Sequence, residues 1–181
     1  MARLPYLSRA DLGPDDQDLL SRPITLHRCL VNSPGADRVF SALGKYIRYD
    51  AKLDPRLREL AILQIGWLAR SPYEWSHHVK IGMEFGVTEA DIHGLIAWNE
   101  GGAHGLDALT SLVLQGAKEV HEGGLSAESF AALQAHFDNA QMVDFTLTTA
   151  FYCAVVRTLA SLAIDVEPEY QPYLDRFPLP A

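Results

Sequence analysis

Apolar residues recur along the chain at intervals of three and four, the spacing that places them on one face of an α-helix. Capping residues, prolines and glycines separate the segments that show this pattern. It predicts helices over residues 35–49, 55–70, 72–85, 88–98, 105–121, 126–136 and 139–164. No convincing run alternates between apolar and polar residues as a half-buried strand does. The sequence therefore predicts an all-α protein, a single-domain helical bundle over residues 1–181 that associates into oligomers.

The most apolar predicted helix lies in the middle of the chain. Between residues 60 and 69, Gln64 is the only polar side chain, whereas a surface helix would carry a charged face. Asp54 and Pro55 provide an N-cap and a first-turn proline. Gly66 would allow a neighbouring backbone to approach closely. We expect this helix to be the centre of the bundle.

A second helix follows directly, because Ser71 precedes Pro72 and is pushed out of the helical conformation, which lets it cap the next helix. Gly86 is expected to end that helix as a left-handed residue. The core helix pair therefore spans about 55–86.

The two ends of the chain differ from the bundle. Residues 1–34 are expected to form an extended N-terminal segment. Residues 166–181 contain four prolines and three aromatic residues, so they are too rigid for a helix and too apolar for a free linker. We expect this Pro-rich C-terminal arm to pack as an extended segment on its own domain or on a partner subunit.

Charge and composition narrow the class of protein. The net charge of −8 and the pI near 5.3 leave no basic stripe for phosphates, so no nucleic-acid partner and no membrane are expected. The N-terminus lacks an apolar signal run, and no stretch reaches the roughly 18 apolar residues of a membrane span. A cytoplasmic location follows as an expectation. Cys29 and Cys153 are far apart in sequence and are expected to be buried apolar residues.

Candidate chemistry concentrates in SPYEWSHH, residues 71–78. Helical spacing predicts that His78 points inward and His77 outward. Glu74 lies one turn before His78, where its carboxylate can reach the imidazole. Glu74 also completes an S-x-x-E capping box, and His78 also fits a core histidine with a satisfied hydrogen bond. The alternative is a carboxylate that orients an imidazole for general acid–base catalysis.

Metal and cofactor sites are not expected. Glu74 and His77 form one E-x-x-H pair, but a carboxylate-bridged di-iron bundle needs a second pair, which is missing. The remaining histidines are scattered: His27, His93, His104, His121 and His136. Nucleophile elbows, Walker loops and dinucleotide fingerprints are also missing.

A family resemblance covers residues 56–96. This stretch resembles the carboxymuconolactone decarboxylase and alkylhydroperoxidase D superfamily in Arg58-Glu59-Leu60, in Tyr73-Glu74-Trp75, in His78, in Gly86 and in the T-x-x-D cap. Counted from Glu59, the CxxC positions of the peroxidase branch fall on Ser71 and Glu74. Neither residue can be oxidised to a disulfide, so the CxxC-dependent mechanism is excluded. The resemblance is to the branch that lacks the CxxC pair.

This resemblance implies a set of site residues. His78 would be the general acid or base, with Glu59 and Glu74 as proton relay or orienting partners. The expected substrate-binding residues are Arg56, Arg58, Tyr73, Trp75 and His77. Arg56 or Arg58 would hold a carboxylate, although both also fit solvated first-turn residues. Tyr73 and Trp75 also fit plain packing.

Three functions stay open. The first is a cofactor-free, decarboxylase-like enzyme that uses Glu/His acid–base chemistry on a small organic acid or lactone. The second is a peroxidase-related antioxidant protein that does not use a CxxC pair. The third is a non-catalytic protein that binds a small ligand or only assembles. The resemblance implies a homo-oligomer, a trimer or hexamer.

Overall fold

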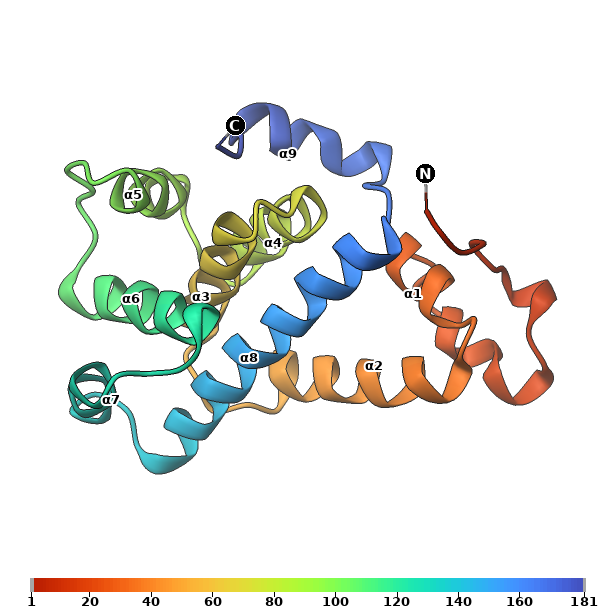
Figure 1. The fold of residues 1–181 in the computed structure, drawn as a ribbon, viewed down its shortest axis with the longest axis horizontal. Helices are drawn as coiled ribbons and strands as arrows, with labels where there is room; N and C mark the ends of the chain where they lie inside the picture. The colour runs from red at the N-terminus through yellow and green to blue at the C-terminus, as the bar shows by residue number, and fades with distance from the viewer. Residues whose placement is uncertain (1, 181) are drawn as a thin grey trace.

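The computed structural model describes residues 2–180, and every regular element in this range is helical. Its helices, shown in Figure 1, are α1 (Thr25–Leu30), α2 (Pro34–Tyr49), α3 (Pro55–Leu68), α4 (Pro72–Glu84), α5 (Glu89–Asn99), α6 (Ala108–Glu122), α7 (Ala127–Gln134), α8 (Asn139–Leu162) and α9 (Gln171–Arg176). Short 3₁₀ helices η1 (Arg9–Asp11), η2 (Pro14–Leu20) and η3 (Pro168–Tyr170) lie near the two ends. The all-α fold class is confirmed.

Helix α3 is the centre of the bundle, as its apolar sequence predicts. It packs against α4, α6 and α8, and its residues 57–67 are all buried. A Cβ on Gly66 would lie 3.3 Å from the backbone nitrogen of Trp75, so glycine at this position allows α4 to lie close to α3. The predicted hairpin is therefore present, with Gly86 at a φ of 95° just after α4.

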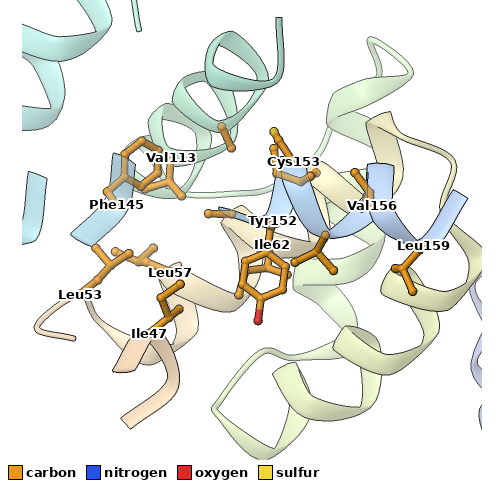
Figure 2. Packing of buried hydrophobic residues seen from close by; sticks show 14 of the residues in the cluster. Ile47, Leu53, Leu57, Ile62, Val113, Phe145, Tyr152, Cys153, Val156 and Leu159 are labelled. Carbon is orange, nitrogen blue, oxygen red and sulfur yellow. The ribbon is translucent and has the colours of Figure 1, made fainter. Parts of the chain in front are cut away.

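The larger hydrophobic cluster lies between α3 and the helices α2, α6 and α8 (Figure 2). Helix α8 is long and apolar enough, by length and composition, to cross a membrane, which the sequence reasoning overlooked. In this fold, however, one face of α8 contributes Phe145, Tyr152 and Val156 to the cluster. A second cluster, between α3, α4 and α5, includes Trp75 and Phe177.

The ends of the chain contain more helix than the sequence predicts. The segment before residue 34 is not extended throughout, because it forms α1, η1 and η2. The C-terminal arm is not purely extended either, because it forms η3 and α9. Pro168 and Pro172 occupy first-turn positions, where the missing N–H costs no helical hydrogen bond. Prolines at these positions are compatible with a helix that ends before the next proline.

Candidate active site

A pocket of about 630 Å³ opens between the α1–α2 side of the bundle and the α4–α8 side. Helix α4 contributes Tyr73, Glu74, His77 and His78 to its wall, and α8 contributes Tyr152. A volume of this size matches the clefts that bind small molecules. Most of the chemically versatile residues of the 71–78 stretch therefore face one pocket.

His78 lies between two carboxylates in this wall. Its Nδ1 is 2.6 Å from Glu59 Oε2 on α3, and its Nε2 is 3.0 Å from Glu74 Oε1 one turn earlier on α4. The three side chains are at most 5% exposed. Glu59 lies behind His78 and does not line the pocket, whereas Glu74 and His78 do. The row Glu59, His78, Glu74 is therefore a line of hydrogen bonds that ends at the pocket.

The charges in this row reinforce one another. Burial alone would lower the pKa of His78, but the charges of Glu59 and Glu74 and their hydrogen bonds outweigh burial, and the pKa is raised. Burial alone would raise the pKa of Glu59, but the charges of His78 and Arg58 lower it. The raised pKa favours the imidazolium form of His78, in which both N–H groups donate to the side chains of Glu59 and Glu74.

Glu74 has only half of the capping role that its sequence position suggests. Ser71 Oγ caps α4 by accepting from the backbone N–H of Glu74 at 3.4 Å. The carboxylate of Glu74 pairs with His78 instead of completing the reciprocal bond to Ser71. The cap fixes the start of α4, and the side chain is left to face the pocket.

Arg58 supports the row from behind and does not clamp a ligand. Its Nε and Nη2 donate to Glu59 Oε1 at 3.1 and 2.9 Å, and its side chain is 2% exposed. The guanidinium also lies over the ring of Phe85, and Nη1 donates to the carbonyl of Arg48. Arg58 is thus buried outside the pocket lining, and its N–H groups donate to Glu59 and to the backbone of Arg48.

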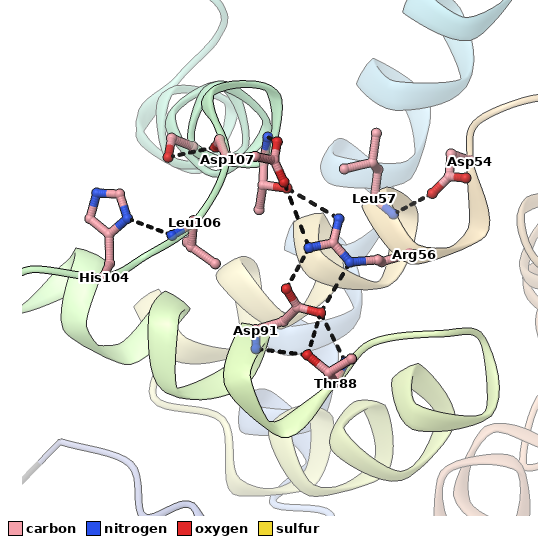
Figure 3. Close-up of polar contacts among 10 residues, drawn as sticks. Asp54, Arg56, Leu57, Thr88, Asp91, His104, Leu106 and Asp107 are labelled. Atoms are coloured by element: carbon pink, nitrogen blue, oxygen red, sulfur yellow. Dashed lines mark hydrogen bonds and ion pairs between the residues drawn. The ribbon is translucent and has the colours of Figure 1, made fainter.

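Arg56 lies away from the pocket, on another side of α3. Figure 3 shows its guanidinium between the starts of α5 and α6, where Nε donates to Asp91 at 3.0 Å and Nη1 donates to Thr110 Oγ1 at 3.2 Å. Nη2 also pairs with Asp91, and Asp107 lies 3.9 Å away. The expectation that Arg56 binds substrate is not supported by this position, because its donors join three helices.

Trp75 also lies outside the pocket, contrary to its expected role. Its ring is fully buried beside Trp67, and Nε1 donates to the carbonyl of Phe177 at 2.7 Å. The helical turn that directs Glu74 and His78 to the pocket directs Trp75 to the opposite, α5-side cluster. Its role is therefore packing.

His77 is buried, so the prediction that it points outward is wrong. Its ring is stacked between Tyr73 and Tyr170, with centroid distances of 4.0 and 3.5 Å. Burial lowers the pKa of His77 despite its hydrogen bond to Glu167, so the neutral ring donates Nε2–H to Oε2 of Glu167 at 2.8 Å. The helical pattern of α4 could not reveal that η3 covers this face.

Tyr73 shares the same contact network. Its hydroxyl lies 3.3 Å from both the backbone nitrogen of Leu26 and Glu167 Oε1, and burial raises its pKa. Hydrogen bonds from His77 and from the backbone of Thr25 lower the pKa of Glu167 to about 2, against the opposing effect of burial. Tyr73 lines the pocket and also helps to hold the C-terminal arm.

The pocket residues that the sequence reasoning missed include Arg48 on α2 and Tyr152 on α8. Tyr152 meets the ring of His78 edge-on at 5.0 Å, and burial raises its pKa. Figure 2 shows its phenol oxygen directed away from the aliphatic side chains. Burial would lower the pKa of Arg48, but Tyr152 and Glu59 raise it, so Arg48 is cationic.

Cations outnumber acids around this pocket, although the chain is acidic overall. Arg38 is neutralised by Asp16 and Asp18. No ion pair within residues 2–180 involves the other three cations of the lining: Arg22, Lys45 and Arg48. The pocket is therefore electrostatically suited to an anion.

Both thiols are buried and neither lines the pocket. Burial raises the pKa of Cys29 and of Cys153, which disfavours the thiolate that peroxide chemistry needs. Within the described residues, no group of three or more His, Cys, Asp or Glu side chains is arranged to hold a metal ion.

Comparison with known proteins finds a similarity to one family. The model of the carboxymuconolactone decarboxylase family matches residues 34–119, the segment that contains α2 to α6 and therefore Glu59, Glu74 and His78. The match covers slightly less than half of the chain, and it makes this segment similar to the carboxymuconolactone decarboxylase family. A comparison with curated proteins gave no match.

Solved structures share the fold over nearly the whole chain. An alkylhydroperoxidase AhpD core protein from Ralstonia eutropha JMP134, described as an uncharacterized peroxidase-related protein, is 20% identical, with a TM-score of 0.78 and coverage of 96% of this chain and 95% of that one. A peroxidase-related protein from Silicibacter sp. TM1040 is 15% identical, with a TM-score of 0.73 and coverage of 94% and 97%. The resemblance to AhpD-like proteins is thereby confirmed at the level of fold.

A third structure of this fold holds a ligand. It is the debrominase Bmp8, a cysteine-to-alanine variant in complex with 2,3,4-tribromopyrrole, which is 18% identical with a TM-score of 0.76 and coverage of 98% of both chains. Proteins with this fold therefore include an enzyme, while at these identities the likeness extends to the fold alone.

Proposed function

We propose that the protein is a cofactor-free acid–base enzyme of the carboxymuconolactone decarboxylase-like type, acting on a small organic acid or lactone. The observation that carries the proposal is the row Glu59, His78, Glu74, which ends at a pocket lined by unpaired cations. Glu74 lines the pocket, where a substrate can contact it. Its carboxyl group is also hydrogen-bonded to the proton donor His78. Proton transfer next to a carbonyl group is the chemistry that fits this arrangement.

The hydrogen bonds of the row suggest a separate role for each side chain. When His78 holds a proton on each nitrogen, its Nε2 proton can pass through Glu74 to a substrate. Glu59 stabilises the positive charge of His78 before the transfer, and Arg58 holds Glu59 in place. Arg48, at the same pocket, is placed to bind a carboxylate group of the substrate. Glu74 is the proposed acid or base, and Glu59 is a positioning residue.

An assay with carboxylated lactones and keto acids tests this proposal. Glu74→Gln and His78→Gln are each expected to lower kcat by about 10²- to 10⁴-fold, the usual contribution of a general acid or base. Glu84→Gln is the matched control, because Glu84 is an exposed acid on the same helix that pairs with Lys80. Equal turnover in wild type and Glu74→Gln would refute the proposed role.

The two other functions give different results in the same series. Peroxide reduction that is lost in Cys29→Ala or Cys153→Ala would identify the peroxidase-related function. The absence of any turnover, together with an unaltered fold in His78→Leu, would identify a protein that only binds or assembles. Both thiols are buried away from the pocket, which favours the acid–base function over the first alternative.

We also propose that the chain forms homo-oligomers. Large apolar side chains are exposed on neighbouring helices, Val39 and Tyr46 on α2 and Val143 and Leu147 on α8. The hydroxyl of Tyr46 donates to Asp144, which joins the two helices. Exposed apolar side chains on adjoining helices support association with a second copy of the chain. Sedimentation analysis of the wild type and of Val143→Glu, which is expected to dissociate, tests this proposal.

A further inference from the structure

The α1–α2 side of the pocket carries a second histidine–carboxylate pair. His27 on α1 and Ser41 on α2 both line the pocket. Nδ1 of His27 lies 2.8 Å from Oδ1 of Asp37, and Ser41 Oγ lies 3.4 Å from each of these atoms. This pair uses none of the residues of the Glu59, His78, Glu74 row.

Asp37 lowers the stability of the fold at its buried position, so packing alone does not explain its presence. It is completely buried, and its Oδ2 has no hydrogen-bond partner in the described part of the chain. A buried carboxylate oxygen without a partner lowers stability, because it loses water and gains no donor in return. His27 is the only ion-pair partner of Asp37 within residues 2–180. The role of Asp37 is therefore to orient the ring of His27 and not to stabilise the fold.

The contact also determines which nitrogen of His27 is available. An ionised carboxylate only accepts, so Nδ1 of His27 donates its proton to Asp37. In the neutral ring this leaves a lone pair on Nε2, for which the described residues offer no hydrogen-bond partner. The side chain is 18% exposed in a residue of the pocket wall. His27 is thus arranged as a base, whereas both nitrogens of His78 are already engaged.

We propose that His27, oriented by Asp37, is a second acid–base residue of this pocket, so that a substrate gives up a proton at one carbon and receives another at a different carbon. This inference rests on the proposed function and deepens it. The two groups come from different walls, His27 from α1 and Glu74 from α4, so they approach a bound molecule from different directions. The reaction class is a proton shift along a conjugated carbonyl compound.

The proton balance can be written for a β,γ-unsaturated γ-lactone that bears a carboxylate. Nε2 of His27 takes the proton from the carbon next to the lactone carbonyl, and the electron pair of the broken C–H bond forms a dienolate. The Nε2 proton of His78 passes through Glu74 to the γ-carbon, where a new C–H bond forms, and the double bond moves to the α,β position. His27 releases its proton to solvent and His78 takes one up from solvent, which restores both groups, and no oxidant or reductant is consumed.

Deuterium incorporation by this probe in D₂O, followed by NMR, tests the proposal. Wild type is expected to convert the lactone and to place deuterium at the γ-carbon. His27→Gln is expected to lower conversion by about 10²- to 10⁴-fold and to abolish exchange at the α-carbon. Glu74→Gln is expected to keep exchange at the α-carbon and to lose deuterium at the γ-carbon. His136→Gln, at an exposed position, is the control.

Position-specific exchange separates a catalytic role of His27 from a structural one, because a loosened fold would reduce exchange at both carbons together. If His27→Gln fails to fold, the double variant His27→Gln/Asp37→Asn removes the buried charge with its partner and gives the same expectation. Conversion that survives in these variants but not in Glu74→Gln would overturn this inference and leave the proposed function intact. A wild type that converts none of the probe would overturn both.

Discussion

Replacing Glu59 with glutamine should destabilise the fold strongly, although the two side chains have nearly the same shape. Glu59 is 1% exposed and accepts hydrogen bonds from Arg58 and His78. Glutamine removes the negative charge that lies between these two cations. Arg58 is then left buried without a counter-charge, and His78 keeps only Glu74.

The size of the effect follows from the contacts. Glu59 accepts at 2.9 and 3.1 Å from Arg58 and at 2.6 Å from His78, and hydrogen bonds to charged groups contribute about 1.5–3 kcal/mol each. The glutamine oxygen still accepts from one neighbour, so the loss is smaller than the sum. Removing one partner of a buried ion pair costs about 3–5 kcal/mol. We expect Glu59→Gln to lower the free energy of unfolding by this amount.

The loss should depend on pH in a defined way. The pKa of His78 is raised, so its contribution is complete below the unfolded value of 6.5 and is lost as the pH rises through the folded pKa. The pKa of Glu59 is lowered, so its contribution is complete above 4.5 and is lost as the pH falls through the folded pKa. The difference between wild type and Glu59→Gln should therefore be largest between pH 4.5 and 6.5 and should decrease at alkaline pH.

Urea unfolding followed by circular dichroism, at several pH values from about 5.5 to about 9.5, measures this difference. Glu84→Gln is the control, because the Lys80–Glu84 pair is exposed and should contribute little. A loss below about 1 kcal/mol at the acidic end, the size of a surface pair, would show that Glu59 does not balance a buried charge. A difference that grows with pH would show that His78 is neutral in the folded protein.

Three further changes test other parts of the structure. Gly66→Ala should destabilise the protein by about 1–3 kcal/mol, because the new Cβ would lie 3.3 Å from the backbone of Trp75. Thermal unfolding measures this loss, and an unchanged Tm would contradict the close packing of α3 and α4. Arg56→Lys should lower stability by about 1–2 kcal/mol, because lysine cannot bind Asp91 through two nitrogens; denaturant unfolding would detect no loss if the pair were ordinary surface charge. His77→Ala should free the C-terminal arm and speed its cleavage in limited proteolysis, whereas equal cleavage would show that the stacked ring does not hold the arm.

The helical framework could be predicted from the sequence because its signals are local. Asp54 with Pro55 and Ser71 with Pro72 start α3 and α4 where the capping rules place them. The fold class and the central position of α3 depend on the same kind of information. The C-terminal arm was harder, because whether a proline stops a helix depends on which turn it occupies.

The pocket could be predicted only in part. Glu74 and His78 were found because their spacing within one helix is visible in the sequence. Arg48, Tyr152 and His27 come from helices far apart in the chain, and only tertiary packing brings them to the pocket. No periodicity within one helix contains this information.

The bond from Trp75 to Phe177 has a consequence for synthesis on the ribosome. The two residues lie 102 positions apart, and Phe177 is fully buried in the cluster on the α4–α5 side. That cluster stays open to water until residue 177 has left the exit tunnel, long after α3 and α4 have emerged. The nascent chain exposes this aromatic surface in the meantime, so closure of this half of the molecule is expected to be a late event in folding.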